Sequence, residues 1–340
     1  MSTYPQARDA FLSEMVRSPH TVRNYRRGIE LFITFAAPST PLAHLGARDR
    51  AILVRYTQWL LDERALSPPT AKLYATACRR WFEWMGLNDY LPQAFPLAKA
   101  LHALSDALAA NLFRPDRRAP EPPDGIELVI RYYDTVELPE RLQARPDPER
   151  VRRWQLTTQR NRALLRCLGE SGGRISEVLS LRVGDFPPQA FAGSEVWRVT
   201  VSGKAGHRYD LRFLDSLPYI EQYLAARGAA ATREAASGGP PPHAPLFVAH
   251  SKRYEGRPLS RVAAWKVVDE ARRALGLPGI HPHDFRHWCA SKLINAGQPL
   301  DVVQEYLGHR SVETTRAYYA HTKSARVDEA ARTVRLLKGD

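Results

Sequence analysis

The stretch HPHDFRHWCASKL, residues 281–293, sets three histidines and an arginine within a helical pattern that continues to Asn295. His283 lies three residues before Arg286, so both side chains project to the same face of a helix. Two other stretches place basic and hydrogen-bonding residues beside glycine breaks, namely SGGRISE at 171–177 and LGHRSVETTRAYY at 307–319. Each stretch alone is a weak signal, but the three in this order indicate one functional site.

The rest of this half predicts helices around one hairpin. Residues 197–201 and 208–213 alternate apolar and polar side chains, and the turn between them holds two glycines and Lys204. Residues 225–243 are rich in Ala, Gly and Pro, so we expect a solvent-exposed insertion there. Helical spacing of apolar residues recurs in five segments, 126–168, 261–274, 284–295, 299–307 and 325–337. The predicted fold class is mainly α with a small antiparallel β-sheet, an α+β arrangement.

The first 100 residues predict a separate helical domain. Val22, Tyr25 and Ile29 follow helical spacing, and another helix is expected to begin at Pro68. Residues 114–125 contain four prolines and no apolar periodicity, which is typical of a linker. We therefore expect a helical domain at 1–113, a linker at 114–125 and a second domain at 126–340.

The charge balance indicates a polyanionic partner. Lys and Arg total 49 against 36 Asp and Glu, a net charge of +13, which favours nucleic acid. Cys78, Cys167 and Cys289 are far apart, so we expect no disulfide framework and no cysteine-based zinc site, and a reducing cytoplasm fits. Residues 1–10 lack a signal-peptide pattern, and no apolar run approaches the ~18 residues of a membrane span, so neither export nor membrane insertion is expected.

These stretches, together with the hairpin at Lys204, resemble the four signature patches of the tyrosine recombinase, or phage integrase, family. The matching segments are GGRISEVLSL at 172–181, HPHDFRHWCASKL at 281–293 and LGHRSVETTRAYYAH at 307–321. SPHTVRNY at 18–25 also resembles the opening SxxTxxxY pattern of the family's helical core-binding domain. Gly173 departs from the pattern, because the family usually has a bulky apolar residue there.

The resemblance implies a site-specific recombinase of the Xer and Cre type that cleaves and rejoins DNA through a 3′-phosphotyrosine intermediate and a Holliday junction. It implies no metal, ATP or other cofactor. The implied partners are double-stranded DNA recombination sites and a homotetramer on DNA, with a monomer or dimer when free, in the cytoplasm and on the nucleoid. The helix expected at 325–337 looks like the segment that family members dock onto a neighbouring protomer, and packing in cis is the alternative.

The same residues suit phosphodiester chemistry. Breaking this bond without a metal requires cations at the nonbridging oxygens, a nucleophile and a proton donor. Arg174 and Arg286 each offer a planar guanidinium that matches phosphate bidentately. Lys204 lies in a turn, from which its long side chain can protonate the leaving 5′ oxygen. His283 can accept the proton of the nucleophile near neutral pH.

Two further residues are candidates for supporting roles. His309 follows the helix expected at 299–307 and can hydrogen-bond a phosphate oxygen, with helix capping as the alternative. Glu177 lies one turn after Arg174 and can orient His283 or Lys204, with a plain salt bridge as the alternative.

Two adjacent tyrosines, Tyr318 and Tyr319, are candidates for the nucleophile. Consecutive helical residues point about 100° apart, so only one can face the phosphate. In the family, the tyrosine usually follows the LGH histidine by nine residues and a Thr-Thr pair by three, and both spacings select Tyr318. The Tyr-x-His ending at His321 favours Tyr319.

Three other functions compete with this interpretation. His283 and His287 at positions i and i+4 resemble a zincin helix, although the general-base glutamate and a third ligand are missing, so a metallohydrolase is one alternative. A non-catalytic DNA-binding protein on the same fold is the second. The third is a type IB topoisomerase-like strand transferase, which shares the chemistry but is disfavoured by the separate helical domain.

Overall fold

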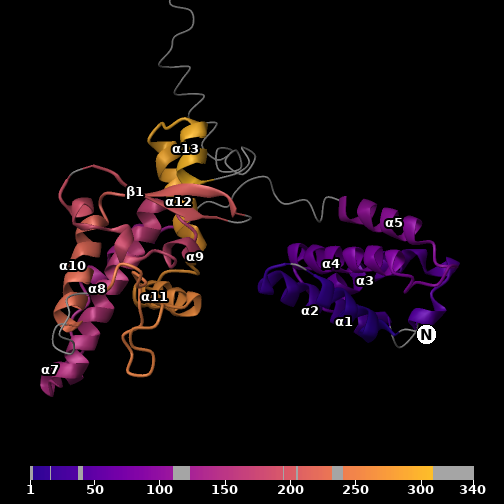
Figure 1. Ribbon diagram of the computed structural model, residues 1–340, viewed down its shortest axis with the longest axis horizontal. Helices are drawn as coiled ribbons and strands as arrows, with labels where there is room; N and C mark the ends of the chain where they lie inside the picture. Colours follow the sequence, from indigo (N-terminus) through magenta and orange to yellow (C-terminus); the bar gives the residue numbers. More distant parts are fainter. Residues whose placement is uncertain are drawn as a thin grey trace, which may run out of the picture. The chain divides into compact units, whose positions relative to one another are not determined.

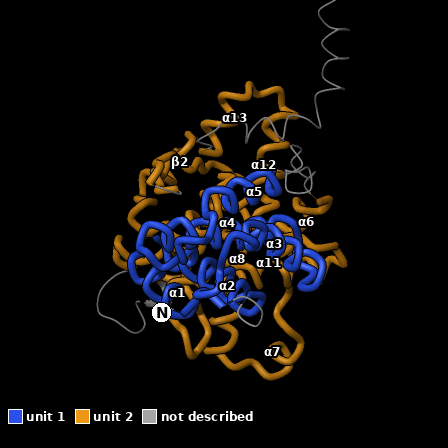
Figure 2. The backbone as a smooth tube through the Cα atoms, turned by 90° about the vertical axis from the view of Figure 1, so that its right-hand side faces the viewer, with its two compact units in different colours: residues 1–116 blue, residues 117–340 orange. Residues whose placement is uncertain are grey.

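The computed structural model describes residues 3–15, 17–36, 41–109, 123–193, 195–203, 206–231 and 240–308 (Figure 1). The chain divides into two compact units, residues 1–116 and 117–340, which Figure 2 shows in different colours. Of the linker predicted at 114–125, only residues 123–125 are among those described. Within the described ranges, no helix is both long and apolar enough to cross a membrane.

The N-terminal unit is built from helices. They are α1 (Tyr4–Glu14), α2 (Pro19–Ala36), α3 (Ile52–Asp62), α4 (Pro68–Leu87) and α5 (Leu97–Ala109), with 3-10 turns at Leu42–His44 and Ala47–Ala51. Phe32 of α2 meets Tyr56 of α3 and Trp81 of α4 in edge-to-face contacts, with ring centroids 5.2 and 5.8 Å away. These aromatic side chains are fully buried, so the apolar faces predicted from the spacing form the core of this unit.

The second unit combines helices with one hairpin. Its helices are α6 (Ile126–Arg131), α7 (Glu140–Ala144), α8 (Pro148–Ser171), α9 (Ile175–Val178), α10 (Leu217–Ala231), α11 (Arg261–Ala274), α12 (Pro282–Asn295) and α13 (Leu300–Leu307). Short 3-10 turns lie at Tyr132–Asp134, Val183–Asp185 and Pro188–Phe191, and the strands are β1 (Trp197–Ser202) and β2 (Arg208–Phe213). The strands pair antiparallel, with Val199 opposite Leu211. The predicted fold, mainly helical with a small antiparallel sheet, is confirmed.

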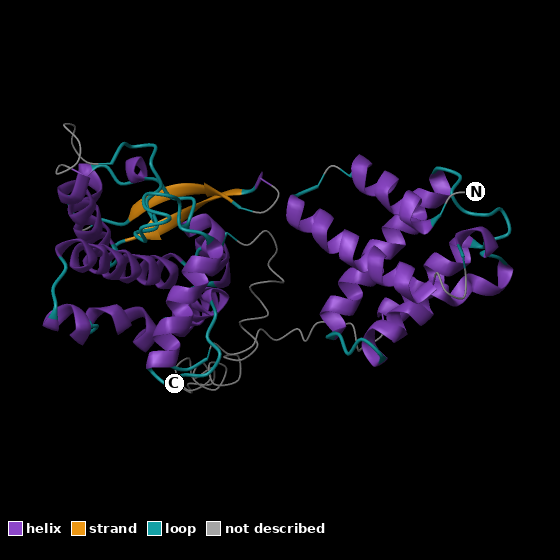
Figure 3. Cartoon of the chain, turned by 90° about the horizontal axis from the view of Figure 1, so that it is seen from below, coloured by secondary structure: helices purple, strands orange, loops and turns teal. Residues whose placement is uncertain are grey.

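Helix α8 is the central element of this unit. It begins where the Asp147 carboxylate accepts hydrogen bonds from the backbone N–H groups of Glu149 and Arg150, and it ends at Gly172, whose φ of +58° is left-handed. It packs against α6, α10, α12 and β2. Figure 3 shows the two strands lying beside the helices of this unit. The end of α8 therefore lies where the sheet and α12 meet.

One predicted segment differs from the structure. Residues 225–231, predicted as the start of an exposed insertion, continue helix α10. Alanine has the highest helix propensity, so this Ala-rich run extends the helix despite Gly228. Arg227 also anchors it by donating to the carbonyl oxygens of Pro245 and Leu246 at 3.0 and 2.8 Å. Residues 232–239 and the helix expected at 325–337 lie outside the described residues.

Candidate active site

Arg286 joins the C-terminal ends of two helices. Its side chain is 1% exposed, and its guanidinium donates to the carbonyl oxygens of Gly172 at 2.9 Å and Leu307 at 2.5 Å. Gly172 ends α8 and Gly308 ends α13, both with left-handed φ. The negative ends of two helix dipoles thus stabilise this buried cation. Burial lowers the pKa of Arg286, and the charge of Arg174 lowers it further.

Arg174 and Glu177 form an ion pair at the start of α9. The Glu177 carboxylate accepts from the backbone N–H of Arg174 at 2.7 Å and from Nη1 of the same residue at 3.0 Å. It also accepts from the hydroxyl of Tyr209 at 2.6 Å. Glu177 is 4% exposed and Arg174 is 37% exposed. The salt bridge left open for Glu177 is therefore present, and its described hydrogen-bond partners do not include His283.

A hollow of about 710 Å³ opens beside this ion pair. We call it the site hollow. It is lined by Arg174, Ile175, Ser176, Arg261, Val262, Trp265, His281, Pro282 and His283, which belong to the starts of α9, α11 and α12. None of these residues is acidic, so the site hollow presents positive charge to an anion.

His283 stands at the wall of the site hollow. Its outer side is exposed, yet burial of the ring lowers its pKa, and the charges of Arg286 and Arg174 lower it further against the opposing effect of Asp284. The imidazole is therefore neutral at neutral pH and suited to accept a proton.

His287 lies beside His283 on α12, and their ring centroids are 4.7 Å apart. Burial and the neighbouring His283 lower the pKa of His287 to about 4. Among the described residues, no group of three histidine, cysteine or carboxylate side chains is placed to hold a metal ion. The third ligand that the zincin alternative requires is thus not found in this part of the chain.

The β1–β2 hairpin and the end of α13 both approach the hydrogen-bonded pair of Glu177 and Tyr209. A β carbon on Gly203 would lie 3.3 Å from Oε1 of Glu177, and one on Gly308 would lie 2.3 Å from the ring of Tyr209. Gly203 directly precedes Lys204, and Gly308 directly precedes His309. Those two residues, Tyr318 and Tyr319 lie outside the described residues.

Gly173, the departure from the family pattern, is accommodated by the sheet. A β carbon at this position would lie 2.8 Å from Cδ2 of Leu211 and 3.1 Å from Cγ2 of Val178. Leu211 of β2 therefore occupies the space into which a side chain at 173 would extend.

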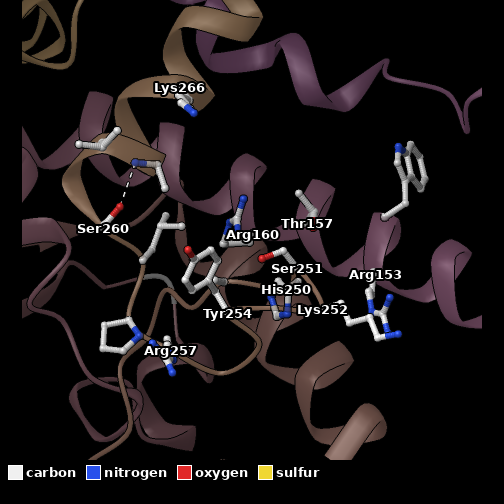
Figure 4. Close-up of a pocket in the computed structure, with 16 residues that line it drawn as sticks. Arg153, Thr157, Arg160, His250, Ser251, Lys252, Tyr254, Arg257, Ser260 and Lys266 are labelled. Carbon is white, nitrogen blue, oxygen red and sulfur yellow. Dashed lines mark hydrogen bonds between the residues drawn. The ribbon is translucent and has the colours of Figure 1, made fainter.

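A second hollow, of about 800 Å³, adjoins the first (Figure 4). We call it the basic hollow. Its lining includes five cationic side chains and no acidic one: Arg153 and Arg160 from α8, Lys252 and Arg257 from the loop before α11, and Lys266 from α11. Val262 lines both hollows. Burial and the surrounding arginines lower the pKa of His250, at its wall, to about 3.

The basic hollow was not predicted from the sequence. The cluster SKRYEGR at 251–257 was the available signal, since it places three cations around Tyr254. The contribution of α8, nearly 100 residues earlier in the chain, had no sequence signal of its own.

Comparison with known proteins connects these features to one family. The sequence profile described as the Phage integrase family matches residues 148–325. The tyrosine recombinase XerC of Rhodospirillum centenum is 30% identical over 308 residues, 88% of this chain and 77% of the relative.

Two solved structures share the fold. The XerH site-specific recombinase, in a post-cleavage complex with palindromic difH substrate, has a TM-score of 0.64 at 19% identity over 91% of this chain and 78% of that one. A lambda integrase tetramer bound to a Holliday junction has a TM-score of 0.57 at 15% identity over 92% of this chain and 78% of that one.

Proposed function

The chain belongs to the phage integrase family and is a tyrosine-type site-specific recombinase, and from this we propose that it cleaves duplex DNA through a 3′-phosphotyrosine intermediate. The observation that carries the proposal is the convergence of Arg174, Glu177, His283 and Arg286 beside one positively lined hollow. The residues that precede Lys204 and His309 meet the same cluster.

The scissile phosphate binds in the site hollow. Glu177 holds the Nη1 side of Arg174, and the exposed remainder of this guanidinium is available to a nonbridging phosphate oxygen. Arg286 adds a fixed positive charge near Arg174, and its low exposure strengthens its attraction for developing negative charge. His309 donates a further hydrogen bond to the phosphate.

The reaction is an in-line displacement at phosphorus. The Tyr318 oxygen forms a bond to phosphorus while the bond from phosphorus to the 5′ oxygen breaks. His283 accepts the Tyr318 proton, which a phenol with pKa near 10 does not release readily in water. Lys204 gives a proton to the leaving 5′ oxygen. The phosphotyrosine ester retains the free energy of the broken phosphodiester bond, so a 5′ hydroxyl can reverse the step without ATP or a metal.

Strand exchange requires several protomers. We assign this chain a homotetramer on two duplex recombination sites, with a Holliday junction between the two rounds of exchange. The lambda integrase tetramer on a Holliday junction, which has the same fold, supports this assignment. The protein then acts in the cytoplasm, where it associates with nucleoid DNA.

The basic hollow extends the DNA interface. Lys252, Arg257 and Lys266 are exposed, and Arg160 lies buried beneath them with its guanidinium bound to the carbonyl oxygen of Val248 at 3.1 Å. Cationic side chains bind DNA phosphates irrespective of base sequence. The DNA backbone therefore continues from the site hollow past Val262 into the basic hollow.

Covalent trapping tests the proposed function. A library of nicked random-sequence duplexes is incubated with the protein. Detergent-resistant complexes are then recovered, and the sequences of their DNA define a suicide substrate. We expect an adduct in EDTA with wild-type protein and with Tyr319→Phe, and none with Tyr318→Phe, which still binds the DNA. An adduct that requires a divalent metal, or that persists in Tyr318→Phe and disappears in Tyr319→Phe, contradicts this mechanism or its nucleophile.

A further inference from the structure

We propose that Tyr209 is a positioning residue for DNA cleavage: its hydroxyl holds the Glu177 carboxylate, which in turn holds the Arg174 guanidinium at the site hollow. This inference rests on the proposed function and adds a residue that the catalytic signature does not contain. Tyr209 lies on β2, five positions after Lys204.

The hydrogen bond between Tyr209 and Glu177 is short and protected from water. The hydroxyl donates to Oε2 of Glu177 at 2.6 Å, and the two residues are 8% and 4% exposed. Burial and the adjacent carboxylate raise the pKa of Tyr209 to about 12. The phenol therefore keeps its proton at neutral pH and serves Glu177 as a donor.

Tyr209 connects the Glu177 carboxylate to a second element of the fold, which the ion pair between Arg174 and Glu177 does not do. Of the three hydrogen bonds that the Glu177 carboxylate accepts from described residues, two come from Arg174, through its backbone N–H and its Nη1. The third comes from Tyr209, on a different element of the fold. Among the described residues, Tyr209 is thus the partner that holds this carboxylate independently of the arginine that the carboxylate orients.

The ring of Tyr209 makes a second connection. It packs against Gly308, at the end of α13, and Gly308 has no side chain to separate the backbone from the ring. One tyrosine therefore contacts α9 through its hydroxyl and the end of α13 through its ring. Because Arg286 ties α13 to α8, Tyr209 and Arg286 together connect α8, α9, α13 and β2.

A nucleophilic role for Tyr209 does not fit this geometry. The residue is absent from the lining of the site hollow, and its hydroxyl faces Glu177. The hydroxyl donates to Glu177 and interacts with the charge of Arg286, and neither of these residues lines the site hollow. Its role is thus to place Arg174, not to attack.

The test uses Tyr209→Phe in the full-length protein on the suicide substrate. Misplacing a catalytic cation by about 1 Å lowers rates by about 100-fold. We therefore expect single-turnover cleavage to fall 10- to 100-fold while DNA affinity changes less than about threefold. The matched control is Tyr56→Phe, which removes a buried hydroxyl bond of equal length, 2.6 Å to the Gly28 carbonyl oxygen, from the other unit. It is expected to cleave at the wild-type rate.

A double-mutant cycle identifies the route of the effect. If Tyr209 acts through Glu177, Tyr209→Phe loses most of its effect in a Glu177→Gln background. Fully additive effects overturn the proposal. So does restoration of Tyr209→Phe by a substrate with sulfur in place of the leaving 5′ oxygen, because sulfur needs no proton donor and such rescue assigns the effect to Lys204.

The remaining outcomes separate this inference from the proposed function. Wild-type protein that forms no adduct defeats the proposed function itself. A wild-type adduct with an unchanged rate in Tyr209→Phe defeats only the positioning role. Complete loss of the adduct in Tyr209→Phe, with binding and thermal unfolding unchanged and with an adduct still formed by Tyr318→Phe, makes Tyr209 the nucleophile and also overturns it.

Discussion

The backbone of Gly308 lies against the ring of Tyr209. A β carbon at position 308 would stand 2.3 Å from Cγ of the ring, and the φ of Gly308 is +62°, in the left-handed region. Two independent constraints thus require glycine at the residue that ends α13 and precedes His309. The contact also couples the hairpin to the end of α13.

Gly308→Ala is expected to impair both stability and cleavage. The left-handed φ alone costs roughly 1–2 kcal/mol for a residue with a β carbon, and the clash with Tyr209 adds to it. Gly276→Ala is the matched control, because Gly276 has a φ of +65° but no atom within 4 Å of the added carbon. Urea unfolding and single-turnover cleavage of both variants provide the comparison. Equal behaviour of the two variants would show that the Tyr209 contact has no effect.

Arg286→Lys is expected to lower stability as well as activity. An ammonium cannot bond the Gly172 and Leu307 carbonyl oxygens in the planar geometry of the guanidinium, so one buried acceptor loses its partner, at a cost of about 1–3 kcal/mol. Arg174→Lys is the control, because Arg174 is 37% exposed and the lysine keeps a positive charge that can pair with Glu177. Cleavage should fall in both variants, but only Arg286→Lys should unfold at clearly lower denaturant concentration. Equal unfolding curves would contradict the structural role of Arg286.

Cleavage should persist at a lower pH than an unperturbed histidine permits. His283 works as a base only when neutral, and burial, Arg286 and Arg174 lower its pKa. The rate should therefore be full above about pH 6.5 and should fall as the pH drops through the lowered pKa. Asp284→Asn removes the opposing carboxylate and should move the midpoint lower still. Cleavage rates measured between about pH 5 and pH 8 give this midpoint. A midpoint above about 6.5 would argue against His283 as the base.

DNA binding should depend steeply on salt, in part through the basic hollow. Each neutralised phosphate contributes about 0.9 to the slope of log K against log salt. Replacing Lys252, Arg257 and Lys266 together by glutamine should reduce that slope by up to roughly 2.7 units. A control with the same charge change replaces three exposed arginines that line neither hollow, Arg131, Arg141 and Arg145. If both triple variants show the same slope, the basic hollow does not contact DNA.

Deletion of residues 325–340 should separate binding from assembly. If this segment docks onto a neighbouring protomer, the truncated protein should bind a single site within about tenfold, a loss of up to about 1.4 kcal/mol. It should form no tetrameric complex and give no recombinant product. Mobility-shift titration and sedimentation velocity measure the two properties. Unfolding or loss of single-site binding would show that the segment packs in cis, and normal recombination would show that it has neither role.

Local sequence alone predicted most of the secondary structure. Helix α11 has the predicted bounds 261–274, and the hairpin strands match their predicted alternation to within a residue. These features depend on apolar periodicity and on short-range capping, which neighbouring residues encode. The prediction of an exposed insertion at 225–231 was wrong for a local reason too. Nearby glycine and proline indicated a loop, whereas the helix propensity of the alanines extends α10.

The candidate residues were also found from sequence, but their relationships were not. Spacing placed His283 and Arg286 on one helical turn, whereas the sequence left open whether Glu177 orients a neighbour or pairs with an arginine. The fold decides this, because the Tyr209 hydroxyl that completes the carboxylate's hydrogen bonds comes from β2, 32 residues away. Likewise, the Gly172 carbonyl that Arg286 binds is 114 residues distant. Such contacts depend on how helix ends and strands pack together, and neither periodicity nor spacing along the chain contains that information.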